Sequence, residues 1–249
     1  MTRFHIRPDA VQGNRVTFDP EEARHLSRVL RLRAGDLVQA LDGRGQALTV
    51  RLTEVGGRAA TGIIIERRPF RTESPLRLTL AQGLPKGDKM DGIIRMATEL
   101  GVAALVPLIT ARTMARAEPA RWAGRLRRWQ RVAKEAAKQS GRGVIPEVSP
   151  PRALAEWLRA ERLEDLLLCL WERERTPLAD VLPPGPVDGA TLVVGPEGGL
   201  AEEEVALLGA AGARVAGLGP RVLRTETAGP VGLALLQARY GDLGVSPGP

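Results

Sequence analysis

Cysteine, histidine and aromatic residues are scarce in this sequence, and each shortage excludes a class of protein. A single cysteine, Cys169, cannot form an internal disulfide, which excludes a disulfide-stapled fold and favours a reducing, intracellular setting. Two histidines and one cysteine offer no zinc-like ligand spacing, so we expect no metal site. With aromatic residues at 3%, a surface paved with stacking rings is not expected.

Long hydrophobic runs are also missing from the sequence. No segment approaches the ~20 consecutive apolar residues that a membrane-spanning helix needs, and the first residues, MTRFHIRPDA, contain no apolar core of a signal peptide. We therefore expect a soluble cytoplasmic protein with no membrane partner. Its 249 residues suffice for one large domain or two of ordinary size.

Positive charge is in excess. The chain has 36 lysines and arginines against 29 aspartates and glutamates, a formal net charge of +7, which favours a polyanionic partner. Basic residues gather in the N-terminal region and along a helix expected at about 119–140, whose opposite face is apolar. For that helix, a solvated basic face is the alternative interpretation. The candidate RNA-binding residues are Arg3, Arg7, His25, Arg28, Arg31, Arg128 and Arg142.

Residues 1–72 are expected to form a small β-barrel or compact sheet. Between residues 36 and 68, short stretches of alternating apolar and polar residues are separated by glycine-containing breaks, a pattern typical of strands. Before them we expect a helix with Asp19 as its N-cap and Gly35 after its end. The polar segment 71–75 contains a proline and marks the domain boundary.

Residues 73–249 follow a different pattern, in which continuously apolar strands alternate with helices. Such strands are typical of a parallel sheet covered on both faces, so this domain is predicted to be α/β. In open parallel sheets, ligands bind beyond the carboxyl ends of the strands. Strands are expected within 76–84, 102–109, 163–171, 191–195 and 213–219, and helices at 88–101, 119–140 and 227–240, with another helix beginning near residue 201.

The segment Val193–Leu200, VVGPEGGL, is a glycine-rich turn after an apolar strand, yet it does not have the features of a phosphate-binding loop. It lacks both the Gly-x-Gly-x-x-Gly spacing of a dinucleotide fingerprint and the Gly-Lys-Ser/Thr ending of a P-loop. Glu197 in its middle would repel phosphate oxygens. The acidic residues Glu202–Glu204 that follow are expected to interact with the positive end of a helix and with solvent.

A second loop, PRVLRTE at residues 220–226, follows the strand that ends in Gly-Leu-Gly. Its glycine, proline, arginine and threonine content, at the carboxyl edge of the sheet, predicts a binding site. Thr225 or Thr227 is expected to cap the helix that follows. Together the two loops would form a narrow pocket for an adenosine moiety without phosphate, and a nearby acidic residue would tolerate a positively charged ligand.

Several segments resemble one protein family. GPEGGLAEEE, LGPRVLRTETA and KGDKMDGIIRMATELGV closely resemble motifs of the RsmE family of ribosomal RNA small-subunit methyltransferases, in the SPOUT (trefoil-knot) superfamily. HLSRVLRLRAGD stands where that family has a PUA-like β-barrel, and the resemblance covers nearly the whole chain. It implies an α/β fold with a SPOUT-like parallel sheet and a C-terminal trefoil knot, preceded by the PUA-like barrel.

The resemblance implies a homodimeric enzyme that uses S-adenosyl-L-methionine to methylate N3 of one uridine in 16S rRNA, on the assembled small ribosomal subunit. It places the cofactor in a cleft formed by three segments. The residues at matching cofactor-binding positions are Leu170, Trp171, Glu172, Gly195, Pro196, Glu197, Gly198, Gly199, Leu218, Gly219, Leu223, Arg224, Thr225, Thr227 and Ala228.

The same resemblance makes Arg224 and Glu226 the catalytic candidates. Arg224, or a basic residue of a partner subunit, would stabilise negative charge on the uracil oxygens, and an ion pair with Glu226 is the alternative role of Arg224. Either Glu226 or Glu197 could accept the N3 proton or instead bind hydroxyls of the cofactor. Two other functions stay open: a related methyltransferase acting on transfer RNA, and a non-enzymatic RNA-binding module.

Overall fold

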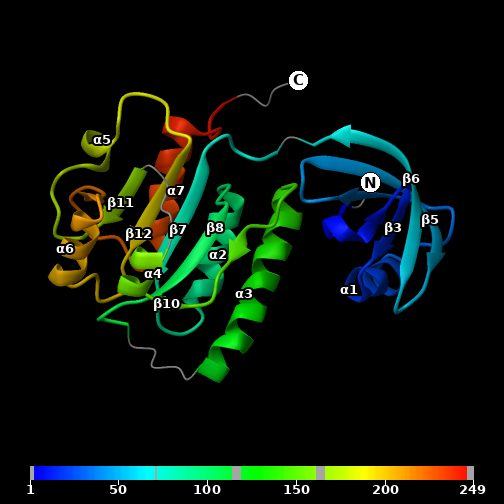
Figure 1. Cartoon of the computed structure of the whole chain (residues 1–249), viewed down its shortest axis with the longest axis horizontal. Coiled ribbons are helices and arrows are strands. Elements are labelled where there is room, and N and C mark those ends of the chain that lie inside the picture. The colour runs from blue at the N-terminus through cyan, green and yellow to red at the C-terminus, as the bar shows by residue number, and fades with distance from the viewer. Residues whose placement is uncertain (1–2, 71, 114–118, 161–165, 246–249) are drawn as a thin grey trace. The chain divides into compact units, whose positions relative to one another are not determined.

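The computed structural model describes residues 3–70, 72–113, 119–160 and 166–245 (Figure 1). Its contacts divide the chain into two compact units, which are described separately below. Unlike the linear division expected from the sequence, the first unit combines two separate stretches of chain. The first unit comprises residues 1–73 and 137–145, and the second comprises residues 74–136 and 146–249.

The first unit is built on one six-stranded sheet in the order β1-β4-β5-β6-β3-β2. Neighbouring strands are antiparallel except for the parallel pair β1 and β4. This is the compact-sheet form of the expected β-rich domain. The strands are β1 (Arg3–His5), β2 (Val11–Gln12), β3 (Arg15–Phe18), β4 (Leu37–Leu41), β5 (Gln46–Val55) and β6 (Ala60–Pro69), joined by the short helices η1 (Pro8–Ala10), α1 (Pro20–Arg24) and η2 (His25–Val29).

The helix expected before this sheet begins where predicted but ends early. The Asp19 carboxylate accepts the backbone N–H groups of Glu21 and Glu22 at 2.9 and 2.8 Å, which confirms the N-cap. A π-helical turn follows, and the chain leaves the helix at Leu30 rather than near Gly35. Arg31 has a φ of 55°, in the left-handed region, and this conformation ends the helix.

Phe4 and Phe18 lie at the centre of the core of the first unit, with ring centroids 5.8 Å apart in an edge-on arrangement. A buried ion pair adds a polar contact: Nζ of Lys138 lies 2.7 Å from the carboxylate of Glu22, whose side chain is 1% exposed. Lys138 belongs to the stretch 137–145, and this contact helps to explain why that stretch joins the first unit.

The second unit contains a seven-stranded sheet in which every strand pair is parallel, as predicted. The strand order is β10-β8-β7-β12-β11-β13, and β9 pairs with β8 beside this path. The strands are β7 (Arg77–Gly83), β8 (Ala104–Ile109), β9 (Glu147–Val148), β10 (Arg152–Ala153), β11 (Leu166–Leu170), β12 (Gly189–Val194) and β13 (Arg214–Ala216).

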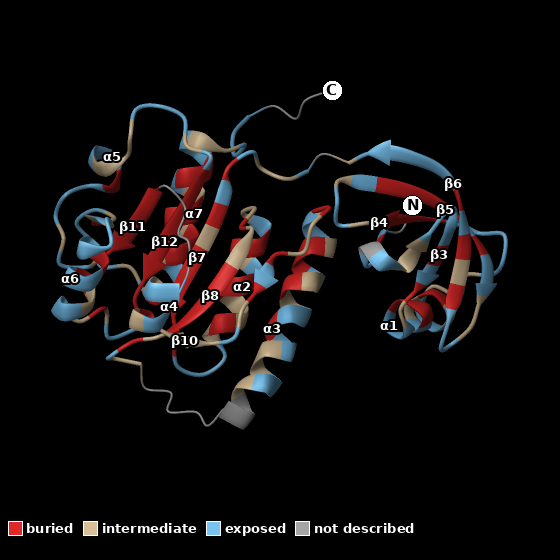
Figure 2. Cartoon of the chain, viewed as in Figure 1, coloured by how far each residue is buried: buried red, intermediate tan, exposed pale blue. Residues whose placement is uncertain are grey.

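Helices cover both faces of this sheet, and β11 and β12 are buried along their whole length (Figure 2). Successive residues of a strand point to opposite faces. Trp157 of α4 lies in the same core as Cys169, whereas α7 packs against β7 and β12, with Gly232 close to Leu192. The helices are α2 (Lys89–Glu99), α3 (Pro119–Ser140), α4 (Leu154–Ala160), α5 (Leu178–Val181), α6 (Glu202–Ala210) and α7 (Thr225–Tyr240).

The single cysteine and the shortage of long apolar runs, both noted in the sequence, have counterparts in the folded chain. Burial raises the pKa of the Cys169 thiol to about 12, so this cysteine packs as a small apolar residue. None of the helices in the described ranges combines the length and the apolar character of a membrane span.

Gly62 of β6 offers a test of the packing in the first unit. A Cβ atom there would collide with Cγ1 of Val50 and lie 2.8 Å from the carbonyl oxygen of Arg51. We expect Gly62→Ala to lower the free energy of unfolding by ~2 kcal/mol, measured by chemical denaturation. As a control, Gly92→Ala within α2 adds a Cβ that meets nothing within 4 Å. It should stabilise by up to ~1 kcal/mol, and equal effects of the two changes would contradict the packing described.

Candidate active site

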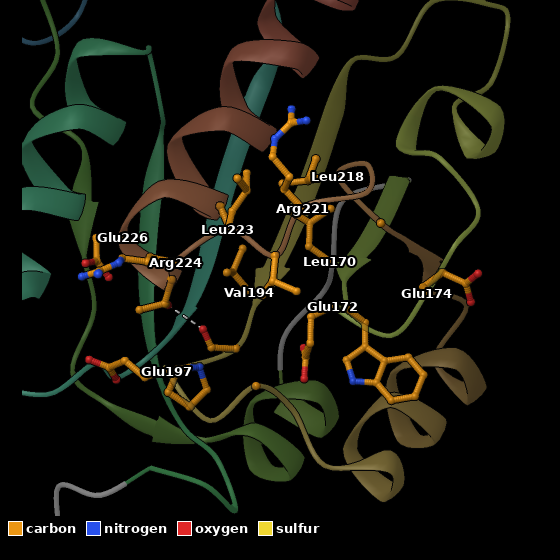
Figure 3. Close-up of a pocket in the computed structure, with 18 of the residues that line it drawn as sticks. Leu170, Glu172, Glu174, Val194, Glu197, Leu218, Arg221, Leu223, Arg224 and Glu226 are labelled. Carbon is orange, nitrogen blue, oxygen red and sulfur yellow. Dashed lines mark hydrogen bonds between the residues drawn. The ribbon is translucent and has the colours of Figure 1, made fainter.

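A cavity of about 430 Å³ opens where three parallel strands end (Figure 3). The first wall is the loop after β12, called the first loop below. The second wall is the loop after β13, and the third wall is the segment after β11. This is the carboxyl edge at which open α/β sheets bind ligands. The cavity is lined by Lys89, Leu170, Trp171, Glu172, Glu174, Val194, Gly195, Pro196, Glu197, Gly198, Gly199, Gly217, Leu218, Gly219, Pro220, Arg221, Val222, Leu223, Arg224, Thr225, Glu226 and Ala228.

The three segments singled out in the sequence therefore meet in one place. Both catalytic candidates, Arg224 and Glu226, line the cavity, and so do all the residues at matching cofactor positions except Thr227. Thr227 is exposed, and its backbone N–H donates to the carbonyl oxygen of Arg224 at 2.8 Å. Thr227 thus contributes to the first turn of α7 and does not line the cavity.

The glycines of the first wall are required by close packing of the backbone. A Cβ on Gly195 would lie 2.8 Å from the carbonyl carbon of Gly199. A Cβ on Gly83, the last residue of β7, would lie 2.6 Å from the backbone nitrogen of Pro196. Gly199 has a φ of +71°, in the left-handed region that favours glycine. The loop is therefore folded tightly on itself and on β7.

Glu197 ties this first wall to the segment before α2. Its carboxylate lies 3.0 Å from Nζ of Lys89 and accepts the backbone N–H of Lys86 at 3.1 and 3.2 Å. Burial by itself would raise the pKa of Glu197, but the hydrogen bonds from Lys89 and from the backbone outweigh it and hold that pKa below its ordinary value. The hydrogen bond that Lys89 donates to the Glu197 carboxylate raises the pKa of Lys89 in turn. Glu197 pins the loop in place.

The second wall corrects an expectation about the start of α7. The N-cap position is taken by Arg224, and Thr225 is the first helical residue, so neither Thr225 nor Thr227 caps the helix. Instead the buried Thr225 hydroxyl donates to the carbonyl oxygen of Gly195 at 2.6 Å. The Thr225 hydroxyl therefore forms a hydrogen bond between the two loops and does not cap the helix.

Arg224 and Glu226 project from the first turn of α7 (Figure 3). The alternative role of Arg224, an ion pair with Glu226, is not what the described residues show: the Glu226 carboxylate instead pairs with Nζ of Lys89 at 3.4 Å. Lys89 therefore bridges Glu197 of the first wall and Glu226 of the second. The Arg224 side chain is exposed at the cavity.

The third wall follows β11. The Glu172 carboxylate lies so close to Gly199 that an added Cβ would collide with it. The guanidinium of Arg173 lies 5.8 Å from the centre of the Trp171 ring, and the Trp171 indole nitrogen is buried without a hydrogen-bond partner. This wall therefore places a carboxylate beside the first loop.

Sequence patterns missed several lining residues, above all Lys89, Glu174 and Arg221. The side chain of Glu174 accepts the backbone N–H groups of Arg175 and Thr176 and so shapes the turn that closes the third wall. Arg221 stands inside a loop that the sequence did single out. Lys89 could have been found from the rule that loops following neighbouring strands converge, because β7 lies next to β12.

The acidic residues after the first loop lie in the first turn of α6, as expected, and two of them make further contacts. The helix does begin at Glu202, but Glu204 is more than a partner of the helix dipole. Its carboxylate accepts the backbone N–H of Ala201 at 2.9 Å and that of Ala111 at 2.8 Å. Glu202 forms an ion pair with Arg173 at 2.6 Å. Glu202 and Glu204 therefore help to hold the segment that joins the first loop to α6.

The structure places the RNA-binding candidates in different surroundings. Arg142 is buried and pairs with Glu73, which removes it from the basic surface predicted from the sequence. Arg128 pairs with Asp88 at 3.3 Å and with Asp91 at 2.6 Å.

The other candidates belong to the first unit. Arg7 pairs with Asp9, Nε of Arg3 donates to Gln39 at 3.0 Å, and the His25 ring packs edge-on against Phe4 with centroids 5.9 Å apart. The remaining two candidates, Arg28 and Arg31, are exposed. In the described part of the chain, no group of three or more His, Cys, Asp or Glu residues could hold a metal ion.

The tether made by Glu197 can be tested by hydrogen exchange. In Glu197→Ala the Lys86 amide loses its acceptor, and we expect it to exchange roughly tenfold faster, since a hydrogen bond to a charged group contributes about 1.5 kcal/mol or more. The control Glu203→Ala alters an exposed glutamate of α6 and should leave that exchange unchanged. An unaltered Lys86 amide in Glu197→Ala would contradict the tether.

The same tether predicts a pH dependence. A lowered carboxyl pKa in the folded chain means that the tether is complete above the ordinary pKa of glutamate and is lost as the pH falls through the lowered pKa. Protection of the Lys86 amide, corrected for intrinsic exchange, should therefore fall toward that of Glu197→Ala only at acidic pH. Loss of this protection near neutral pH would contradict the assignment.

Comparison with known proteins gives the chain its family. An RNA methyltransferase domain model matches residues 72–237, and an RNA methyltransferase PUA domain model matches residues 18–65. The ribosomal RNA small subunit methyltransferase E of Bacillus subtilis is 34% identical over 218 residues, 84% of each chain. That of Synechocystis is 36% identical over 239 residues, 95% of this chain and 77% of the relative.

A solved structure agrees. The crystal structure of ribosomal RNA small subunit methyltransferase E from Neisseria gonorrhoeae, bound to S-adenosyl methionine, is 36% identical with a TM-score of 0.86, over 97% of this chain and 99% of that one. The two family models follow one another along the chain in the order that the strands had indicated, with the β-rich part first. The chain belongs to the ribosomal RNA small subunit methyltransferase E family.

Proposed function

We propose that this protein transfers the methyl group of S-adenosyl-L-methionine to N3 of one uridine in 16S rRNA. The observation that carries the proposal is the cavity, in which the three loops after β11, β12 and β13 meet. A volume of about 430 Å³ suits a small nucleoside ligand. The relatives named above are ribosomal RNA small subunit methyltransferases, which supports methyl transfer to this RNA, and one of them was solved with this cofactor.

The lining residues fit such a cofactor. Trp171 lines the cavity, and its indole nitrogen is buried without a hydrogen-bond partner. Four glutamates against one lysine and two arginines give the lining an excess of negative charge, which suits a sulfonium and disfavours a phosphate.

When bound, the cofactor supplies an electrophilic methyl group on a positively charged sulfur. The chain must hold uracil N3 in line with that methyl carbon at about 3–3.5 Å. As the N3–carbon bond forms, the carbon–sulfur bond breaks with its electron pair going to sulfur, and the N3 proton passes to a base. Arg224, exposed at the cavity, stabilises the negative charge that develops on the uracil oxygens.

Glu226 is the better candidate for the proton acceptor. Both carboxyl groups line the cavity, but Glu197 already accepts the Lys86 N–H and pairs with Lys89 at 3.0 Å. Glu226 has the single, longer contact to Lys89 at 3.4 Å. Glu226, near the start of α7, is thus freer to receive a proton.

We further propose that the enzyme acts as a homodimer on the assembled small ribosomal subunit in the cytoplasm, and that its cofactor loops form a trefoil knot. The formal net charge of +7 and the match to an RNA methyltransferase PUA domain support RNA binding by the first unit. There, Arg3, Arg7, Arg28 and Arg31 are the exposed members of the candidate set, and Arg28 and Arg31 carry none of the ion pairs or hydrogen bonds described above.

Substitution of Arg224 tests the proposed chemistry. We expect Arg224→Ala to lower kcat by ~100-fold or more, because the charge that forms on the uracil oxygens loses its stabilising partner, while RNA affinity stays nearly unchanged. Methyl transfer from radiolabelled cofactor to small subunits measures the effect. Arg159→Ala, an exposed arginine of α4, serves as the control. Near-normal turnover in Arg224→Ala would overturn the role of this residue.

The substrate is tested in cells. In a strain lacking this protein, mass spectrometry of 16S rRNA should show the loss of one 3-methyluridine, restored by the wild-type chain and not by Arg224→Ala. Loss of a methylated nucleoside from transfer RNA with 16S rRNA intact would support the transfer RNA alternative. If neither RNA loses a methyl group, the non-enzymatic alternative gains support.

A further inference from the structure

A buried carboxamide lies beneath the cavity floor without lining the cavity. Gln82, next to the last residue of β7, is 0% exposed. Its Nε2 donates to the carbonyl oxygen of Gly83 at 3.0 Å, to the Thr225 hydroxyl at 2.9 Å and to the carbonyl oxygen of Gly195 at 3.4 Å. One side chain therefore contacts both loops that form the first and second walls.

The chemistry of the partners fixes the orientation of this amide. Backbone carbonyl oxygens only accept hydrogen bonds, so the nitrogen of Gln82 and not its oxygen must face Gly83 and Gly195. The Thr225 hydroxyl donates its proton to Gly195 at 2.6 Å and accepts from Gln82. Gln82, Thr225 and the Gly195 carbonyl form a closed triangle, named here the Gln82 triangle.

The amide is held there at a cost in stability. Its Oε1 is buried without a hydrogen-bond partner, and an unsatisfied buried acceptor is unfavourable. Gly229 of α7 leaves the room it needs, because a Cβ at that position would lie 3.1 Å from Oε1. An apolar side chain of the same size would remove the unsatisfied oxygen. The Gln82 triangle thus serves something other than global stability.

The parts that the triangle joins carry the proposed chemistry. Gly195 opens the first wall, and Thr225 stands between Arg224 and Glu226, which both line the cavity (Figure 3). Pulling the Thr225 hydroxyl onto Gly195 fixes the peptide from which both side chains extend. A catalytic group displaced by ~1 Å can lose about 100-fold in rate.

We propose that Gln82 is a positioning residue for methyl transfer, which acts through Thr225 and Gly195 to hold Arg224 and Glu226 in register with the first loop. The inference rests on the proposed function and names a residue outside the cavity as part of its machinery. It also explains why the first helical residue of α7 is a buried threonine.

The test compares the kinetics of matched variants. Gln82→Met keeps the size of the side chain and removes its donor, and we expect kcat to fall by 10- to 100-fold. The KM for the RNA substrate should change by less than about threefold, because no RNA-contacting group is altered. Thr225→Val should lower kcat by a similar factor. Thr225→Ser, which retains the hydroxyl, should keep most of the wild-type kcat. The double variant Gln82→Met/Thr225→Val should be no slower than the slower single variant.

Thr191→Val is the control for a buried polar group lost from the same sheet. Thr191 of β12 is 1% exposed and contributes nothing to the Gln82 triangle. This variant should keep the kcat of the wild type. Thermal melting of each variant, with activity expressed per folded molecule, separates positioning from folding.

Each outcome has a defined meaning. A wild-type chain without methyl transfer would overturn the proposed function itself. With an active wild type, an unchanged kcat in Gln82→Met would overturn the positioning role, and so would an equal loss in Thr191→Val. If Gln82→Met does not fold, Thr225→Val against Thr225→Ser decides: equal activities of these two would overturn the inference, and rescue by serine would support it.

Discussion

Where β7 and β12 end side by side, the chain packs backbone against backbone, and the walls of the cavity are placed by that contact. Gly83 has no room for a Cβ because Gly195 and Pro196 lie against it. Gly195 has none because the turn folds back and brings Gly199 and Leu200 against it. With β11 on the other side of β12 and β13 beyond it, the loops that leave these strands converge on the same edge. The cavity is the space that this close packing leaves open.

Electrostatic contacts then hold the walls against one another. Lys89 bridges Glu197 and Glu226, so a single ammonium group links the first loop, the start of α2 and the start of α7. Such partly exposed ion pairs contribute little to overall stability. Their effect is on placement, since they leave the cavity lined by ionised groups at fixed positions.

Much of this arrangement follows from local sequence. Continuously apolar strands predicted the parallel sheet, and the rule for carboxyl edges brought GPEGG and PRVLRTE together. Glu197 was expected to repel phosphate oxygens, and in the structure its carboxylate holds the turn through Lys89 and the Lys86 N–H. These predictions depend on patterns within a few residues or on one topological rule.

The failures share a different cause, which is pairing between distant residues. Arg142 read as part of a basic surface, yet it is buried against Glu73, 69 positions away. Thr225 read as a helix cap, yet its hydroxyl bonds to Gly195. The helix ends early because Arg31 adopts the left-handed conformation, and no glycine in the sequence marks that position. Periodicity and capping rules carry no information about such partners.

The central claim is that the cavity takes a positively charged nucleoside without phosphate. Titration calorimetry of the purified chain with S-adenosyl-L-methionine and, separately, with ATP tests it most directly. The account predicts one site per chain for S-adenosyl-L-methionine with a dissociation constant on the order of micromolar, and far weaker binding of ATP. Binding of ATP as tight as that of S-adenosyl-L-methionine, or no binding of S-adenosyl-L-methionine, would contradict it.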